Sequence, residues 1–142
     1  MTDELTRKKV GIRLPRHVSP QSAEQRWGYE LEALAPVADI TEILADTPAE
    51  FAAAAGDLDA VITSWGIRLD REIIGALKHC VVIGVSGVGV DMVDVEAATA
   101  AGIVVTNVPD VFIEEVADHA MMLLLNVARM TPLMAKMARA GQ

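Results

Sequence analysis

Short apolar runs alternate along the chain with longer segments in which apolar positions recur every three or four residues. The longer segments predict helices and the short runs predict strands. Strands that alternate with helices are typical of βαβ units, so the pattern predicts an α/β fold built on a parallel sheet. The last three runs are almost continuously apolar, which indicates strands covered by helices on both faces. Five strands are predicted, near Lys9–Arg13, Val37–Glu42, Leu58–Thr63, Cys80–Gly84 and Ile103–Thr106.

Capping residues mark where the predicted helices begin and end. Thr47 offers an N-cap hydroxyl, Pro48 stands at the first helical position, and Glu50 has capping-box spacing. Gly56 supplies the stop for this helix. Three more helices are expected: from Ser19–Pro20 to about Leu34, from Asp70 to about Leu77, and between Asp94 and Gly102.

The last predicted helix runs from about Phe112 to Ala140 and has an apolar middle. Ala120–Leu125 reads AMMLLL, so no face of that turn is polar. A helix that is apolar all round must be buried all round. A small sheet can cover one side of this helix, and nothing else in this chain is expected to cover the other. Pro132 is expected to kink or divide it.

The charge balance excludes two classes of partner. The formal net charge is −8, which argues against binding to nucleic acid or to an anionic membrane surface. The longest apolar run is too short to span a bilayer, and the N-terminus does not read as a signal peptide. Basic residues near the start are interpreted as solvated flanks of the first strand: Arg7, Lys8, Lys9, Arg13 and Arg16.

One cysteine, Cys80, is present in 142 residues, so no disulfide can form within the chain. Its neighbours are apolar, which predicts a small core residue in a reducing compartment, and cytoplasmic residence is the expectation. The three histidines, His17, His79 and His119, have no partner at metal-ligand or catalytic-triad spacing. No metal site is predicted.

The glycine turn, Ser86–Asp91, follows a predicted strand and precedes a predicted helix. It is not a dinucleotide fingerprint, because G-x-G-x-x-G needs a small last residue where this sequence has Met92. The helix is also expected to begin later, near Asp94. Backbone N–H groups that are exposed by two glycines form a concavity that binds anions, a carboxylate above all. The alternative, a tight turn needed only for chain reversal, remains open.

Three segments together match a known family. Ile83–Asp91, Val93–Pro109 and Glu115–His119 resemble the D-2-hydroxyacid dehydrogenases, in particular their phosphoglycerate-dehydrogenase-like and C-terminal-binding-protein-like branches. The resemblance is dense over Leu77–Arg129 and loose before it. It implies a flavodoxin-like five-stranded parallel sheet of order 2-1-3-4-5 in residues 1–108, the substrate domain. Residues 109–142 would form a linking helix toward a Rossmann cofactor domain that is absent from this chain.

The resemblance also implies a function and a set of site residues. The parent enzyme would reduce a 2-keto acid to a D-2-hydroxy acid with NAD or NADP, and would be a homodimer. Backbone amides of Val88 and Gly89 would hold the substrate carboxylate, with Gly87 shaping the turn and Ser86 beside it. Asp91 is expected to pin the loop rather than to react.

Other positions are assigned by the same resemblance. Val88 and Val116 would lie against the cofactor, although plain core packing explains Val116 equally well. Asn107–Pro109 looks like the crossover by which the chain leaves the substrate domain. Ser64 and Trp65, at the end of the third strand, are expected near the mouth of the cleft, and Trp65 is equally an ordinary rim residue.

The family's catalytic groups are expected after Gln142. Hydride transfer in the family needs a dinucleotide fingerprint, an arginine and a histidine–glutamate pair, and no catalytic residue is predicted in this chain. The chain alone is therefore expected to be inactive. The alternative is a stand-alone small-acid-binding or interaction module of the same fold. A phosphoacceptor receiver domain is disfavoured, because the first strand ends in Arg13-Leu14-Pro15 instead of acidic residues.

Overall fold

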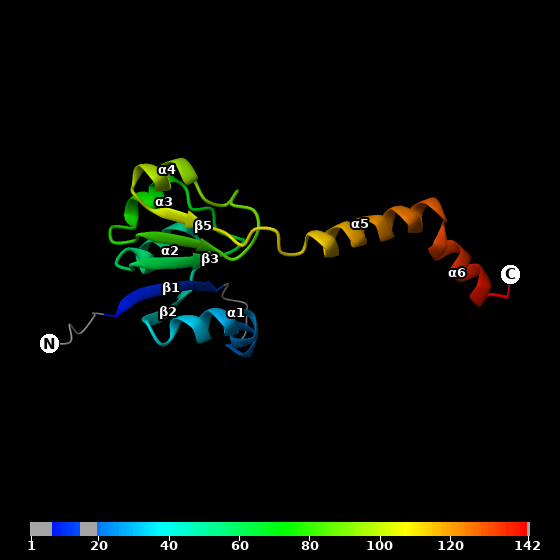
Figure 1. The fold of residues 1–142 in the computed structure, drawn as a ribbon, viewed down its shortest axis with the longest axis horizontal. Helices are drawn as coiled ribbons and strands as arrows, with labels where there is room; N and C mark the ends of the chain where they lie inside the picture. Colours follow the sequence, from blue (N-terminus) through cyan, green and yellow to red (C-terminus); the bar gives the residue numbers. More distant parts are fainter. Residues whose placement is uncertain (1–6, 15–19, 142) are drawn as a thin grey trace. The chain divides into compact units, whose positions relative to one another are not determined.

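The structure, a computed structural model, describes residues 7–14 and 20–141, and the side chains of all of these except residues 20–26. The chain divides into two compact units, of which the first ends at Pro109 and the second begins at Asp110. Figure 1 shows the strands and helices that make up each unit.

The first unit is an α/β domain with one sheet. The sheet has five parallel strands in the order β2-β1-β3-β4-β5, which confirms the predicted topology. Every predicted strand is present, and its ends differ from the expected ones by at most two residues. Its elements are β1 (Lys8–Leu14), α1 (Pro20–Leu34), β2 (Ala38–Leu44), α2 (Pro48–Ala55), β3 (Ala60–Thr63), α3 (Arg71–Ala76), β4 (Val82–Val85), α4 (Val95–Ala100) and β5 (Val104–Thr106).

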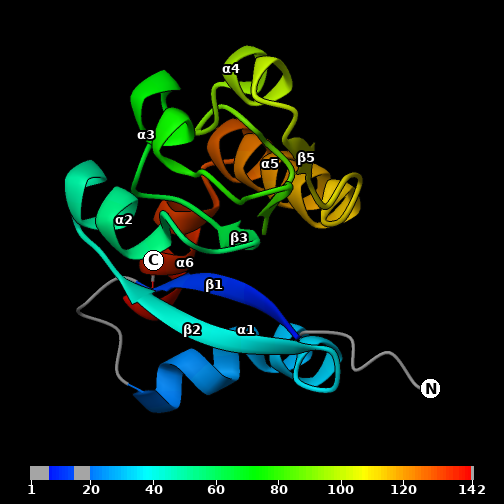
Figure 2. The ribbon, with the colours of Figure 1, turned by 90° about the vertical axis from the view of Figure 1, so that its left-hand side faces the viewer.

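Two apolar layers hold helices against the sheet. The larger layer lies between the strands and α2, α3 and α4, and is centred on fully buried side chains such as Phe51, Leu69 and Ile83. On the opposite face, Trp27 of α1 packs with Ile12 of β1. Figure 2 shows α2 and α3 on one side of β1 and β2, with α1 on the other.

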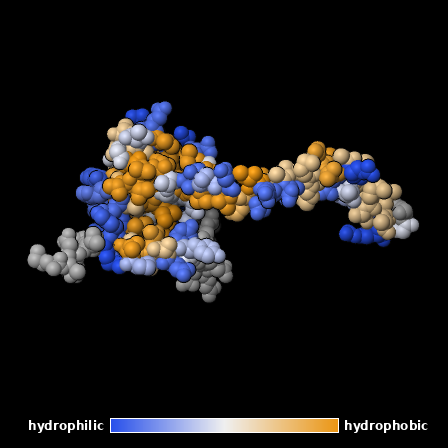
Figure 3. Space-filling view, viewed as in Figure 1, coloured by the Kyte–Doolittle hydropathy of each residue, from blue (hydrophilic) through white to orange (hydrophobic). Residues whose placement is uncertain are grey.

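Helices of the first unit cover the second face of the sheet only in part. α1 packs against β2, β1 and, through Ile62, β3. The expectation of helices over both faces is therefore wrong within this unit for β4 and β5. Val82 of β4 is half-buried and Val104 of β5 is 60% exposed. Apolar residues accordingly reach the surface over the strands (Figure 3). An almost continuously apolar strand sequence therefore does not show that helices of the same unit cover both faces of the strand.

The helix caps form as the sequence predicts. The Thr47 hydroxyl accepts a hydrogen bond from the Glu50 N–H, as expected of an N-cap. The Glu50 carboxylate accepts from the Asp46 N–H, one residue before the N–H that a capping box uses. Asp70 caps α3, and the carboxylate of Asp94 accepts from the Ala97 N–H at 2.8 Å at the start of α4. Ser19, the expected start of α1, lies outside the described residues. Local hydrogen bonds thus fix where the helices of the larger layer begin.

The second unit consists of α5 (Ile113–Ala128) and α6 (Thr131–Arg139). Met130, with a left-handed φ of 52°, separates them, and Pro132 lies in the first turn of α6, so the predicted division is confirmed. No residue of either helix is buried, in agreement with the expectation that this chain cannot cover the helix on every side. The physical reason is that two successive helices contain no second layer that could cover Ala120–Leu125.

Candidate functional site

The carboxyl ends of β3, β4 and β5 bring three loops to one edge of the sheet. The three strands are parallel neighbours, so the segments after Thr63, Val85 and Thr106 leave the sheet at the same edge. In open α/β sheets this edge is where ligands bind. Ser86, Gly87, Val88 and Gly89 all lie there, immediately after β4.

Backbone hydrogen bonds connect the glycine turn to both neighbouring loops. The Ser86 N–H donates to the Thr63 carbonyl at 2.8 Å, which joins the turn to the end of β3. The Gly87 carbonyl accepts from the Val108 N–H at 3.0 Å. The Val88 carbonyl accepts from the side-chain amide of Asn107 at 2.7 Å. The turn is therefore fixed from two sides.

Across the described residues, four N–H groups of the turn have no hydrogen-bond acceptor, those of Val88, Gly89, Val90 and Asp91. Val88 and Gly89 are the two that the family resemblance predicts to hold the carboxylate. Both residues are exposed. Exposed N–H donors on successive residues are what an anion-binding turn requires. We call these two donors the open amides.

The two glycines of the turn, Gly87 and Gly89, matter for the space that they leave and not for their backbone conformation. Neither Gly87 nor Gly89 has a left-handed φ, so the backbone conformation of the turn does not demand glycine. A Cβ atom on Gly87 would meet nothing within 4 Å, whereas one on Gly89 would come within 2.7 Å of the Asp91 carboxylate. The space next to the turn is therefore open at Gly87 and closed by Asp91 at Gly89. No hydrogen bond or ion pair to a described residue supports a pinning role for Asp91.

Arg13 also lies at this edge, and its interpretation as a solvated flank is wrong. The side chain is only 3% exposed, and its guanidinium donates to the carbonyls of Trp65 and Ala45. Gly66, with a φ of 111°, lets the loop pass close to the guanidinium. Ser64 is buried and Trp65 is 76% exposed, so Trp65 alone of this pair presents its side chain to solvent. Arg16 lies outside the described residues.

Val116 belongs to the second unit, on the first turns of α5. Its side chain is 66% exposed, so core packing does not explain it in this structure. With His119 and Leu123 it borders a shallow groove along the helix. His119 is exposed on the same helix, and its imidazole has no hydrogen-bond partner in the part of the chain that the structure describes.

Cys80 is a core residue, as predicted. It is 7% exposed and its thiol donates to the Val82 carbonyl at 3.2 Å. Burial raises the pKa of the Cys80 thiol, which disfavours the nucleophilic thiolate. Within residues 7–14 and 20–141 no group of His, Cys, Asp and Glu side chains could hold a metal ion. None of the helices described there is long and apolar enough to span a membrane.

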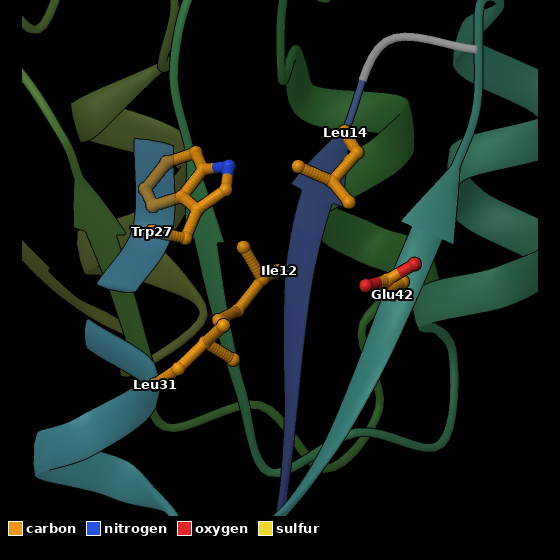
Figure 4. A pocket seen from close by; sticks show the side chains of 5 residues that line it. All are labelled: Ile12, Leu14, Trp27, Leu31 and Glu42. Atoms are coloured by element: carbon orange, nitrogen blue, oxygen red, sulfur yellow. The ribbon is translucent and has the colours of Figure 1, made fainter. Parts of the chain in front are cut away.

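A small apolar cavity lies beside α1, away from the glycine turn. Figure 4 shows Trp27 and Leu31 of α1 facing Ile12 and Leu14 of β1, with Glu42 on β2. Its volume is about 10 Å³, close to the space that one water molecule occupies. The buried indole N–H of Trp27 has no hydrogen-bond partner among the residues that the structure describes. The cavity is too small for a substrate.

Fold and site together define an α/β domain with a candidate anion site at the carboxyl edge of a parallel sheet. Residues 22–139 match the family described as "D-isomer specific 2-hydroxyacid dehydrogenase, catalytic domain". The chain belongs to this family, which confirms the resemblance noted in the sequence.

Individual relatives agree with this assignment. A glyoxylate reductase of Pyrococcus furiosus is 41% identical over 86 residues, which cover 61% of this chain and 26% of that protein. A D-3-phosphoglycerate dehydrogenase of Methanocaldococcus jannaschii is 43% identical over 76 residues, covering 54% of this chain and 14% of that protein. The chain thus matches about a quarter or less of the length of these curated relatives.

A solved structure extends the similarity over nearly the whole chain. The PH0520 protein from Pyrococcus horikoshii OT3 has a TM-score of 0.73 and 30% identity. The similarity covers 96% of this chain and 38% of that protein. The chain therefore has the fold of one part of a longer protein.

Proposed function

We propose that this chain is the substrate-binding part of an NAD(P)-dependent D-2-hydroxyacid dehydrogenase, which reduces a 2-keto acid to the corresponding D-2-hydroxy acid. Family membership and the names of the relatives, glyoxylate reductase and D-3-phosphoglycerate dehydrogenase, support the class of reaction. Residues up to about 108 would form the substrate domain and residues 109–142 the link to a cofactor domain. We also propose a cytoplasmic homodimer for the whole enzyme.

The observation that carries the proposal is the pair of open amides, Val88 and Gly89, at the carboxyl edge of the sheet. Their two N–H donors suit the carboxylate that 2-keto and 2-hydroxy acids share. Ser86 and Gly87 would border the bound acid, since a Cβ atom on Gly87 would meet nothing within 4 Å. The chain would thereby hold and orient the acid.

The chain's own residues fit only a small part of a dinucleotide. Val88 and Val116 have exposed apolar side chains, which suit a nicotinamide ring. Met92, Val93 and Asp94 separate the glycine turn from α4. A dinucleotide fingerprint holds phosphate with glycines directly at a helix N-terminus, and the glycines of this turn do not lie there. An acyclic imino acid reductase with 19% identity to this chain was solved with NADPH, and that likeness shows the fold alone. We therefore assign no step of hydride transfer to these residues.

An assay of NADH oxidation with a panel of 2-keto acids tests this function. The longest reading frame that contains these residues is expected to oxidise NADH with at least one acid. The 142-residue chain is expected to bind the acid without turnover. Saturable NADH binding or turnover by the 142-residue chain would contradict this division of labour. If both the 142-residue chain and the protein from the longest reading frame bound the acid without oxidising NADH, a stand-alone binding module would be favoured instead.

A further inference from the structure

Among the described residues, Asn107 is the one whose side chain donates a hydrogen bond to the glycine turn, and the proposed function gives it no role. Its amide nitrogen donates to the Val88 carbonyl at 2.7 Å, and the next residue, Val108, donates its N–H to the Gly87 carbonyl at 3.0 Å. Asn107 directly follows β5, the strand paired with β4. The two bonds thus come from the segment directly after the neighbouring parallel strand.

Peptide geometry gives these bonds a consequence for the open amides. In a trans peptide unit, the C=O of one residue and the N–H of the next point in opposite directions in one plane. No peptide bond among the described residues is cis. Turning the Gly87 carbonyl toward Val108 therefore turns the Val88 N–H away from that segment. Turning the Val88 carbonyl toward Asn107 does the same to the Gly89 N–H.

We propose that Asn107 is a positioning residue of the carboxylate site, which orients the Gly89 N–H through its hydrogen bond to the Val88 carbonyl. This inference rests on the function proposed above. The Val108 N–H orients the Val88 N–H in the same way, through its hydrogen bond to the Gly87 carbonyl. Because this donor belongs to the backbone, only a proline at position 108 would remove it. Asn107 is therefore the position at which side-chain chemistry controls the direction of one of the two donors, the Gly89 N–H.

Asn107 suits this role because its side chain is short and neutral. The Asp91 carboxylate already lies beside Gly89, and an amide N–H₂ at position 107 donates without adding a second negative charge, which an aspartate would do. Asn107 is exposed, so the hydrogen bond is not needed to satisfy a buried group. Fixing the donors before the ligand arrives lowers the ordering cost of binding.

A titration of the 142-residue chain with pyruvate, followed through the amide signals of Val88 and Gly89 by NMR, tests the proposal. The wild-type chain is expected to shift both signals in a saturable way. Asn107→Leu keeps the branched shape without a donor, and Asn107→Ala removes the donor without adding bulk. Both are expected to weaken pyruvate binding about fivefold, the effect of one lost hydrogen bond. Asn107→Gln, which keeps the donor, is expected to recover part of the affinity.

Asn126→Leu is the matched control, because Asn126 lies on α5 in the second unit. It is expected to bind pyruvate as the wild type does. Unchanged affinity in Asn107→Leu and Asn107→Ala would overturn the positioning role and leave the proposed function standing. An equal loss in Asn107→Gln and Asn107→Leu would also overturn it, because shape would then matter instead of the donor. A wild-type chain whose Val88 and Gly89 signals do not respond would overturn the carboxylate site itself.

Discussion

At the scale of single residues, charged side chains join strands that are distant in sequence. The Asp59 carboxylate, just before β3, accepts from the Lys9 N–H at 2.8 Å and from the Lys8 ammonium at 2.9 Å. These hydrogen bonds, that to the Lys9 backbone first, lower the pKa of Asp59. Arg7 similarly contacts Asp39 at 2.7 Å, next to the start of β2. The first strand is thereby held at its beginning on both sides.

The lowered pKa of Asp59 predicts a dependence of stability on pH. A carboxyl group whose folded pKa is depressed stabilises the fold above its unfolded pKa, about 3.9, and loses this contribution as the pH falls through the folded value. Asp59→Asn is therefore expected to lower the free energy of unfolding at pH 7 and to have little effect near pH 2. Urea denaturation at both values measures this. Asp57→Asn, at an exposed neighbour, is the control, and an equal loss at both values of pH would contradict the argument.

Residue-scale features were predictable where the partner is local. Thr47, Asp70 and Asp94 cap helices three residues or fewer away, so the sequence contains both partners side by side. Arg13 is different, because its guanidinium binds carbonyls 32 and 52 residues further along the chain. The hydrogen bond from Asn107 to Val88 spans 19 residues. Only the folded sheet brings such groups together, and a basic residue at a strand end gives no sign of it.

At the scale of elements, two glycines in regular structure have opposite surroundings. Gly11 lies in β1, and a Cβ atom there would come within 2.4 Å of Leu58 and 2.5 Å of Ile43, both buried. Gly75 lies in α3, and a Cβ atom there would meet nothing within 4 Å. Neither has a left-handed φ, so space alone distinguishes them.

Gly11→Ala and Gly75→Ala form a matched pair of tests. Gly11→Ala is expected to destabilise the first unit by about 1–3 kcal/mol, because the added methyl group overpacks a closed layer. Gly75→Ala is expected to stabilise it by about 0.5–1 kcal/mol, since alanine is the better helix former. Thermal or urea unfolding of the two variants compares them directly. A Gly11→Ala variant that is as stable as the wild type, or more stable, would show that the packing of β1 against Leu58 and Ile43 is looser than the structure has it.

The elements themselves were largely predictable, because each rests on a periodic pattern of several residues. The strand order 2-1-3-4-5 came from the family resemblance, since local patterns specify strands but not their neighbours. Which strand faces lie under a helix could not be predicted from the sequence. Val82 and Val104 are as apolar as Val61 and Val85, yet only the latter two lie under helices of the first unit. A strand pattern reports how apolar a strand is, and not which other element covers it.

At the scale of the whole molecule, the second unit presents the largest apolar helix surface. α5 and α6 bury no residue, and the exposed side chains form a continuous series along them. Soluble monomers rarely expose contiguous apolar patches of this kind. The exposed large apolar residues of this helix pair are Ile113, Val116, Met121, Met122, Leu123, Leu124, Leu125, Val127, Leu133, Met134 and Met137.

This surface predicts that the 142-residue chain self-associates as its concentration rises. Leu124 and Leu125 are 60% and 55% exposed, so charges at these positions are compatible with the helix itself. The double variant Leu124→Glu, Leu125→Lys is expected to lower the average mass in light scattering while helix content by circular dichroism stays the same. Hydrogen exchange supplies the second measurement, with slow exchange in α5 expected only for the associated wild type. A wild-type chain that stays monomeric, with amides of residues 120–138 as protected as that of Ile83, would show that α5 is covered within a single chain.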